Sequence, residues 1–257
     1  MRRAIILMLC WAAAVSAQSE LPAQLRNIGV DQKLDATVPP DLVMRDESGA
    51  QVRIGDYFGK RPVILSLVYY KCPMLCDMVL NGMLRAMRTI SLDAGKDFEV
   101  VTVSFDPRET PALASAKKAS YIEKYRRSTG AAGWHFLTAD QASIQRLAET
   151  VGFKYAFDEK ANQFVHASAI MVLTPDGKLS RYFYGVEYPP RDLRLGLIEA
   201  SQRKIGNPVD QILLFCFHYD PATGKYGLLI TRVIRITGTF FVFAMIAGIV
   251  LLNRRKQ

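Results

Sequence analysis

The feature that most constrains this chain is an apolar, β-branched run that ends in a polar corner carrying two cysteines. Residues 62–70 read PVILSLVYY, and Cys72 and Cys76 follow, four positions apart. Apolar side chains then recur at helical spacing, at Leu80, Met83 or Leu84, Met87 and Ile90. The pattern predicts a buried strand, a short loop and a helix, with Cys76 at or near the first helical turn.

The spacing of the two cysteines limits the chemistry that they can perform. Residues four apart lie on one side of a helix, so two sulfur atoms can point at one spot. Backbone N–H groups at a helix N-terminus also stabilise a thiolate and lower its pKa. Cys72 and Cys76 can therefore bind a soft metal together or close a disulfide. Two buried structural cysteines, or a plain structural disulfide, remain the alternative interpretation.

Both ends of the chain predict an exported protein held at a membrane. Residues 1–17 read as a signal peptide, with two arginines, an apolar run and a small-residue cleavage site. Residues 236–252 form a second apolar run without a charge, which predicts a single transmembrane helix. Basic residues follow in the tail, residues 253–257. The positive-inside rule then predicts a cytoplasmic C-terminus and a main domain on the periplasmic, outer face of the inner (cell) membrane.

Charge and cysteine usage agree with export. The formal net charge of +9 favours closeness to an anionic membrane surface or to an acidic partner. No basic stripe interleaved with aromatic residues appears, so the sequence predicts no nucleic-acid partner. After processing, Cys72, Cys76 and Cys216 would remain, and an oxidising compartment allows the first two to pair.

The order of the predicted elements indicates an α/β domain over residues 31–205, between a linker at 18–30 and a juxtamembrane segment at 206–235. A β-hairpin is expected at residues 42–54, before the cysteine corner. Later strands are expected at 98–105, 134–137, 153–157, 169–173 and 179–183, and helices at 112–125, 138–151 (capped by Thr138) and 191–204. This order favours a thioredoxin-like fold with a mixed central sheet and helices on both faces.

Three motifs in order give the domain a specific resemblance to a known family. Residues 72–76 read CPMLC after an apolar strand, and residues 104–110 read SFDPRET after the next strand. Val165 and His166 precede IMVLTPDG at residues 170–177. The chain resembles the Sco/SenC family of membrane-anchored, thioredoxin-like copper chaperones for cytochrome c oxidase assembly.

The resemblance implies a copper site built from Cys72, Cys76 and His166. Ligand chemistry agrees with it, because thiolates are soft and suit Cu(I), while an imidazole lets the same site tolerate Cu(II). Three protein ligands leave one position open for a ligand of a partner. The resemblance also places Asp106 near the copper, where it would tune the charge or orient His166 without binding the metal. Asp106, like the two cysteines, would fall at the carboxyl end of a strand, where ligands gather in open α/β sheets.

Two functions of different classes are compatible with these residues. The first is a copper-binding assembly factor, not an enzyme, that passes copper to the copper-centre subunit of a respiratory oxidase or to another copper chaperone. The resemblance alone supplies the oxidase. The second is a thiol–disulfide oxidoreductase, with Cys72 as the attacking thiolate, Cys76 as the resolving thiol and His166 tuning both. Metal binding needs His166, whereas thiol exchange should survive its loss in weakened form.

Two further histidines receive different interpretations. His135 lies on a predicted short strand between two aromatic residues and is interpreted as a packing residue. Cys216 and His218 stand two positions apart, so on a strand their side chains would face the same way. They are a hypothetical second copper site, and the alternative is a membrane-proximal aromatic segment with an incidental thiol.

Overall fold

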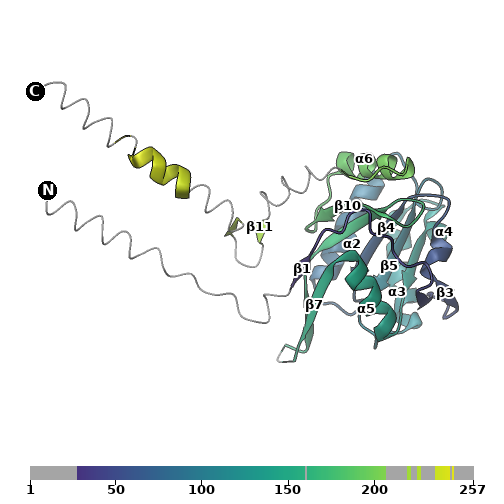
Figure 1. The fold of residues 1–257 in the computed structure, drawn as a ribbon. Coiled ribbons are helices and arrows are strands. Elements are labelled where there is room, and N and C mark those ends of the chain that lie inside the picture. The colour runs from purple at the N-terminus through teal and green to yellow at the C-terminus, as the bar shows by residue number, and fades with distance from the viewer. Residues whose placement is uncertain are drawn as a thin grey trace, which may run out of the picture. The chain divides into compact units, whose positions relative to one another are not determined.

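The computed structural model describes residues 28–159, 161–206, 219–220, 225–226, 235–243 and 245. The chain divides into two compact units, Met1–Ile205 and Gly206–Gln257, and each is described by itself. The first unit carries all the elements that build the candidate site (Figure 1).

A five-stranded mixed sheet forms the centre of the first unit, in the order β10-β9-β4-β5-β6. Its strands are β4 (Val63–Val68), β5 (Glu99–Ser104), β6 (Trp134–Leu137), β9 (Ala169–Leu173) and β10 (Leu179–Tyr184). β4, β5 and β6 run parallel, whereas β9 is antiparallel to β4 and β10 is antiparallel to β9. Every residue of β4 is buried, as the unbroken apolar run predicts for a strand covered on both faces. The predicted mixed α/β arrangement of the thioredoxin type is confirmed.

Helices follow the strands in the expected order. They are α2 (Leu75–Thr89), α3 (Pro111–Tyr125), α4 (Gly130–Gly133), α5 (Gln141–Val151) and α6 (Pro190–Ser201), with a 3₁₀ turn, η2, at Ile54–Tyr57. α2 buries the apolar face that its spacing predicts, including Leu80, Met83 and Met87. α2 packs against both α3 and α6, and these contacts hold the helix in place.

One predicted helix cap is corrected by the structure. The N-cap of α5 is Asp140, whose side chain accepts a hydrogen bond from the Ser143 N–H, and not Thr138. Thr138 instead forms an antiparallel bridge with Arg45. The helix ends at Gly152 in the left-handed conformation (φ 69°), as expected for a glycine cap.

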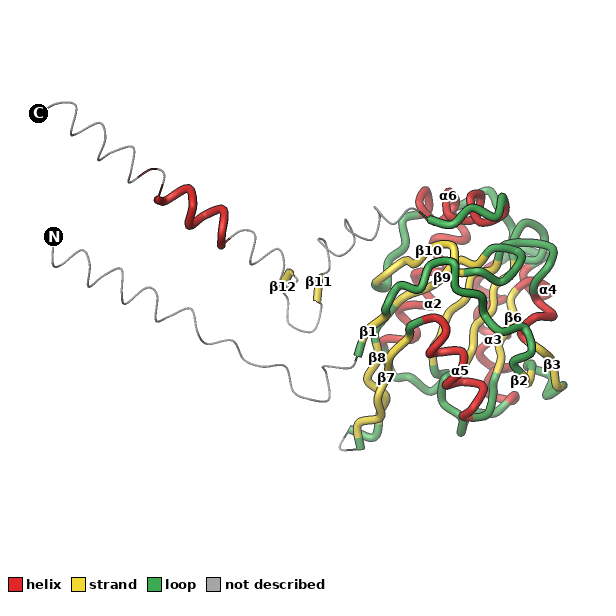
Figure 2. The backbone as a smooth tube through the Cα atoms, in the orientation of Figure 1, coloured by secondary structure: helices red, strands yellow, loops and turns green. Residues whose placement is uncertain are grey.

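Two smaller sheets complete the first unit. The predicted hairpin is present as β2 (Val43–Arg45) and β3 (Gln51–Arg53). A three-stranded sheet pairs β1 (Gly29–Val30), β7 (Phe153–Asp158) and β8 (Gln163–His166). The β7–β8 hairpin projects from the body of the unit (Figure 2). β8 was not predicted as a strand, and His166 is its last residue.

The predicted membrane span is corrected. No helix among the described residues is long and apolar enough to cross a membrane. The predictions of a transmembrane helix at 236–252 and of a single-pass membrane protein are therefore wrong for this part of the chain.

Several other predictions concern residues that the structure does not describe. They are the signal peptide (1–17), most of the linker (18–30), the tail (253–257), and the Cys216 and His218 pair. In the second unit the described strands β11 (Tyr219–Asp220) and β12 (Lys225–Tyr226) pair antiparallel.

Candidate metal centre

Two neighbouring cysteines and a histidine that is distant in the sequence meet at the carboxyl end of β4. Cys72 lies in the loop after this strand, Cys76 in the first turn of α2, and His166 at the end of β8. One ligand atom from each lies within 4.8 Å of the others, and the Cys76 Sγ and His166 Nε2 atoms are 3.3 Å apart. All three residues are buried, with Cys76 fully so and the other two 7% exposed.

Backbone hydrogen bonds hold the two sulfur atoms in place. The Cys76 N–H donates to Cys72 Sγ, and the Tyr69 N–H donates to Cys76 Sγ, each at 3.3 Å. The Cys72 N–H donates in turn to the carbonyl of Tyr69, which closes a tight turn between strand and helix. The strand–loop–helix pattern therefore places both sulfur atoms at a helix N-terminus, where backbone N–H groups face them.

The two thiols have opposite pKa shifts. The pKa of Cys72 is held well below its ordinary value, chiefly by a hydrogen bond with the Cys76 side chain, and further by His166 and by backbone N–H groups. Burial raises the pKa of Cys76, and the neighbouring Cys72 raises it further. At neutral pH the arrangement is one thiolate beside one protonated thiol.

The backbone sets the orientation and tautomer of His166. Its Nδ1 atom lies 2.8 Å from the carbonyl oxygen of Ala167. Because a carbonyl oxygen only accepts, Nδ1 carries a proton, and Nε2 is the ring nitrogen that faces Cys76. Aromatic rings surround the imidazole, with the Phe105 centroid 5.1 Å and the Phe153 centroid 5.9 Å away. The ring is thus fixed with its ligand atom facing both sulfurs.

The donor set fits copper. Cys72 and Cys76 are both free thiols, so both sulfur atoms are available to a metal. Two sulfurs and one imidazole nitrogen form a soft set that suits Cu(I) and accommodates Cu(II). Three ligands in one enclosed spot leave a coordination position for a further ligand.

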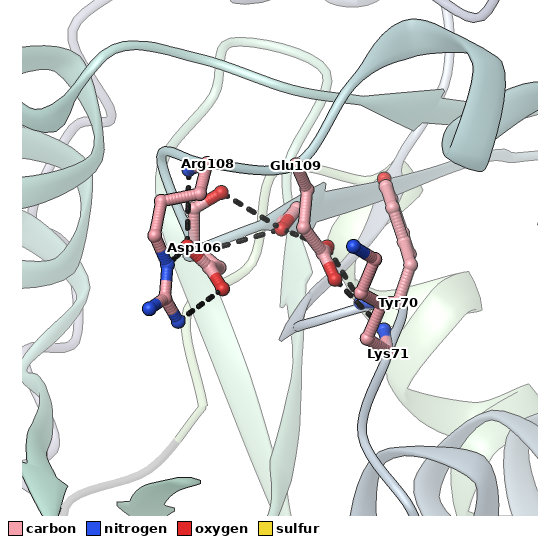
Figure 3. A network of polar contacts seen from close by, with 6 residues as sticks. Tyr70, Lys71, Asp106, Arg108 and Glu109 are labelled. Carbon is pink, nitrogen blue, oxygen red and sulfur yellow. Dashed lines mark hydrogen bonds and ion pairs between the residues drawn. The ribbon is translucent and has the colours of Figure 1, made fainter. Parts of the chain in front are cut away.

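A buried carboxylate that the sequence analysis missed supports the cysteine loop (Figure 3). Glu109 accepts hydrogen bonds from the N–H groups of Tyr70 and Lys71, at 2.6 and 2.7 Å. Its Oε2 atom also accepts from the hydroxyl of Ser104, at 2.6 Å. The Tyr70 hydroxyl anchors the same loop, since it donates to the Leu137 carbonyl at 2.7 Å. Glu109 therefore ties the segment immediately before Cys72 to the end of β5.

Asp106 lies beside this network, at the predicted end of β5. Its carboxylate accepts three hydrogen bonds from Arg108, two from the guanidinium at 2.8 Å and one from the backbone N–H at 3.0 Å. Burial raises its pKa, but the bonds from Arg108 outweigh burial and the net pKa is lowered. The hydrogen bond that orients the His166 ring comes from the Ala167 backbone. A role for Asp106 toward a bound metal stays a prediction.

A cavity of about 340 Å³ opens beside the cysteine loop. Its walls come from the cysteine loop, the end of β5 and the β7–β8 turn. The lining residues are Tyr69, Lys71, Pro73, Asp106, Arg108, Glu109, Asn162 and Gln163. Arg108 also lies over the rings of Phe157 and Phe164, at 5.1 and 5.5 Å from their centroids. The cavity therefore joins the central sheet to the small sheet that supplies His166.

The remaining predicted histidines lie elsewhere or outside the described residues. His135 on β6 lies 3.3 Å from the carboxylate of Glu99 and packs against the ring of Tyr57. These contacts agree with a packing role. Cys216 and His218 are outside the described residues, so the second copper site stays a prediction.

The domain has a thioredoxin-like fold. It carries two buried thiols and one imidazole at the carboxyl ends of its parallel strands. These features are typical of thiol-based redox proteins and of proteins that bind soft metals. The model of the SCO1/SenC family matches residues 31–196, and the chain belongs to this family. No curated protein sequence matches the chain.

Solved structures share the fold. A protein of Aquifex aeolicus assigned to electron transfer is 26% identical, covers 66% of this chain and 95% of its own, and has a TM-score of 0.60. Copper-bound ScoI of Arabidopsis thaliana is 18% identical, with 65% and 99% covered and a TM-score of 0.51. BsSco, a Sco-family cytochrome c oxidase assembly protein with a disulfide switch, is 21% identical, with 68% and 99% covered and a TM-score of 0.50.

Proposed function

We propose that this protein binds one copper ion through Cys72, Cys76 and His166 and passes it to the copper centre of a respiratory cytochrome oxidase, or to another copper chaperone. One observation carries the proposal: the two sulfur atoms and the imidazole nitrogen lie within 4.8 Å of one another in an enclosed site. Membership of the SCO1/SenC family supports the choice of copper. The Sco proteins of known structure include a copper-bound one and one from cytochrome c oxidase assembly, which supports the choice of partner.

The residues around the site suit a metal that is bound and then released. The Ala167 carbonyl keeps the Nε2 lone pair of His166 directed at the sulfurs, so the ring need not reorient when copper arrives. The Cys72 thiolate is ready to bind, and Cys76 gives up its proton as copper enters. A ligand of the partner occupies the open position first, and the protein ligands then leave one at a time.

The first experiment is copper stoichiometry on the reduced full chain. We expect one copper ion per chain, and its loss in Cys72→Ser, Cys76→Ser and His166→Ala. The matched control is His135→Ala, because His135 lies on the same domain but contacts Glu99 and not the thiols. Copper that survives in His166→Ala would remove the three-ligand site.

The second experiment tests delivery. The copper-loaded chain is mixed with the metal-free copper-centre domain of a cytochrome c oxidase, and the absorption bands of the oxidase centre are followed. We expect these bands to grow as copper leaves this protein. Stable copper binding without any transfer would make storage or sensing the better account.

Thiol–disulfide exchange is a second candidate function, favoured by the opposite pKa shifts of Cys72 and Cys76. An attacking thiolate beside a protonated resolving thiol is the arrangement that such exchange needs. A disulfide-reduction assay separates the two functions. Exchange predicts that Cys72→Ser abolishes activity while His166→Ala retains part of it.

A further inference from the structure

Two exposed methionines lie beside the enclosed copper ligands. Met74 stands between the two cysteines in the loop and is 68% exposed, and Met78 stands in the first turns of α2 and is 42% exposed. The other methionines in the described part of this unit are buried, and they are Met44, Met83, Met87 and Met171. Among the described residues of this unit, the exposed methionines are therefore the two that flank Cys76 in the sequence.

The fold does not explain a methionine at either position. Met74 is the N-cap of α2, where serine, threonine, aspartate and asparagine are preferred because their side chains accept a backbone N–H. Its side chain makes no such hydrogen bond. Met78 lies on the outward face of an amphipathic helix, where polar residues are usual. Neither side chain caps the helix or fills the core.

The backbone places the two methionines one turn apart. The Met78 N–H donates to the Met74 carbonyl at 3.1 Å. Residues at this spacing have Cβ atoms about 5–6 Å apart, and three rotatable bonds give each methionine ample reach. The two sulfur atoms can therefore close on a single ion.

The chemistry of the pair matches the proposed cargo. A thioether is a soft ligand that suits Cu(I), and it needs no deprotonation. Cys76 is fully buried, while Cys72 and His166 expose only 7%. The two thioethers are therefore much more exposed to solvent than the enclosed ligands.

We propose that Met74 and Met78 form a capture site for Cu(I) on the surface, from which the ion passes inward to Cys72, Cys76 and His166. This inference rests on the proposed copper-binding function. In the inward step two Cu–thioether bonds break while bonds to two thiolate sulfurs and to His166 Nε2 form. The Cys76 proton passes to water, and the copper remains Cu(I), so no electron donor or acceptor is required.

The test measures the rate and the equilibrium of copper uptake separately. The reduced full chain receives Cu(I) from its coloured bicinchoninate complex in a stopped-flow instrument, and the loss of colour gives the rate. Titration with the same complex gives the affinity. The key variant is Met74→Leu with Met78→Leu, because leucine keeps the apolar surface and the approximate volume but removes the sulfur. The matched control is Met245→Leu, an exposed methionine of the other unit.

We expect the double variant to take up copper about tenfold more slowly, with unchanged stoichiometry and affinity. An uptake rate equal to that of the wild type, or an equal slowing in Met245→Leu, would overturn the inference. If the wild type binds no copper at all, the proposed function fails instead, and the two failures are thereby distinguished.

A second measurement detects the capture site directly. In a chain with Cys72→Ser, Cys76→Ser and Cys216→Ser the thioethers remain, so weak Cu(I) binding with sulfur ligands is expected in X-ray absorption. Adding Met74→Leu and Met78→Leu should remove these sulfur ligands. Sulfur ligation that persists without the methionines would contradict the capture site.

Discussion

Two groups of side chains meet at the carboxyl ends of β4 and β5, and they differ in how fully their hydrogen-bonding capacity is used. Around Glu109 the contacts are short, at 2.6–2.7 Å, and both carboxylate oxygens accept. The contact between Cys76 Sγ and His166 Nε2 is longer, at 3.3 Å, and joins two atoms that can each bind a metal. The two groups therefore have different roles. The carboxylate network stabilises the loop, whereas each sulfur atom accepts one backbone N–H and still has a lone pair for an ion.

The largest effect on stability should come from Glu109→Ala. This change leaves the buried N–H of Tyr70 and the partly buried N–H of Lys71 without their acceptor, so we expect a loss of about 3 kcal/mol in the free energy of unfolding. Urea unfolding of the metal-free protein measures it. Glu109→Gln, which keeps one acceptor oxygen, should lose less. A loss of stability in Glu109→Ala that is smaller than the loss in Cys72→Ser would contradict the comparison.

The next effect should come from Tyr70→Phe. The lost hydroxyl donates to the Leu137 carbonyl and also lies 3.1 Å from the Thr102 carbonyl, both in the buried sheet. We expect a loss of about 1.5 kcal/mol in the same assay. Because the backbone N–H of Tyr70 still reaches Glu109, the copper stoichiometry should stay at the wild-type value.

Asp106→Asn should give a smaller effect that depends on pH. The folded pKa of Asp106 is lowered, so the ionised group stabilises the fold above its ordinary pKa of about 3.8, and this contribution is lost as pH falls through the folded value. Arg108 is 61% exposed, which limits the difference to about 1 kcal/mol at pH 7. Unfolding curves at pH 7 and near pH 3 should show the difference shrinking. A difference that is constant with pH would show that the carboxylate charge is not the cause.

The smallest effect on stability should come from Cys72→Ser. Serine keeps an acceptor for the Cys76 N–H, so we expect a change of about 0.5 kcal/mol in the metal-free protein. The same variant should lose copper. A small change in the free energy of unfolding together with a complete loss of copper binding would support the comparison. A large loss of stability would instead place Cys72 in the network around Glu109 that stabilises the loop.

The sequence predicted the parts of the site that local pattern controls. The unbroken apolar run of β4 and the helical spacing after Cys76 placed both thiols correctly at a strand end and a helix start. Glu109 was missed because it accepts from backbone groups 38 and 39 residues away, and spacing does not reveal such a contact. Its position three residues after Asp106, at the end of a neighbouring parallel strand, was the available signal.

Other differences have equally physical reasons. His166 was found by its motif, but the strand that carries it is short and only partly buried, so it lacks a clear alternating pattern. Thr138 and Asp140 are both good capping residues, and only the pairing of Thr138 with Arg45 decides between them. The membrane span was inferred from an apolar run followed by basic residues, and no described helix is both long and apolar enough to cross a membrane.

The distance along the chain between Cys76 and His166 has a consequence for biogenesis. The two cysteines form within a local strand–helix unit, but their imidazole partner follows 90 residues later. Non-local contacts form late in folding, because loop closure must precede them. A nascent chain that ends before β8 has both thiols and no third ligand. The complete set of three ligand atoms therefore assembles only after β8 has joined the fold.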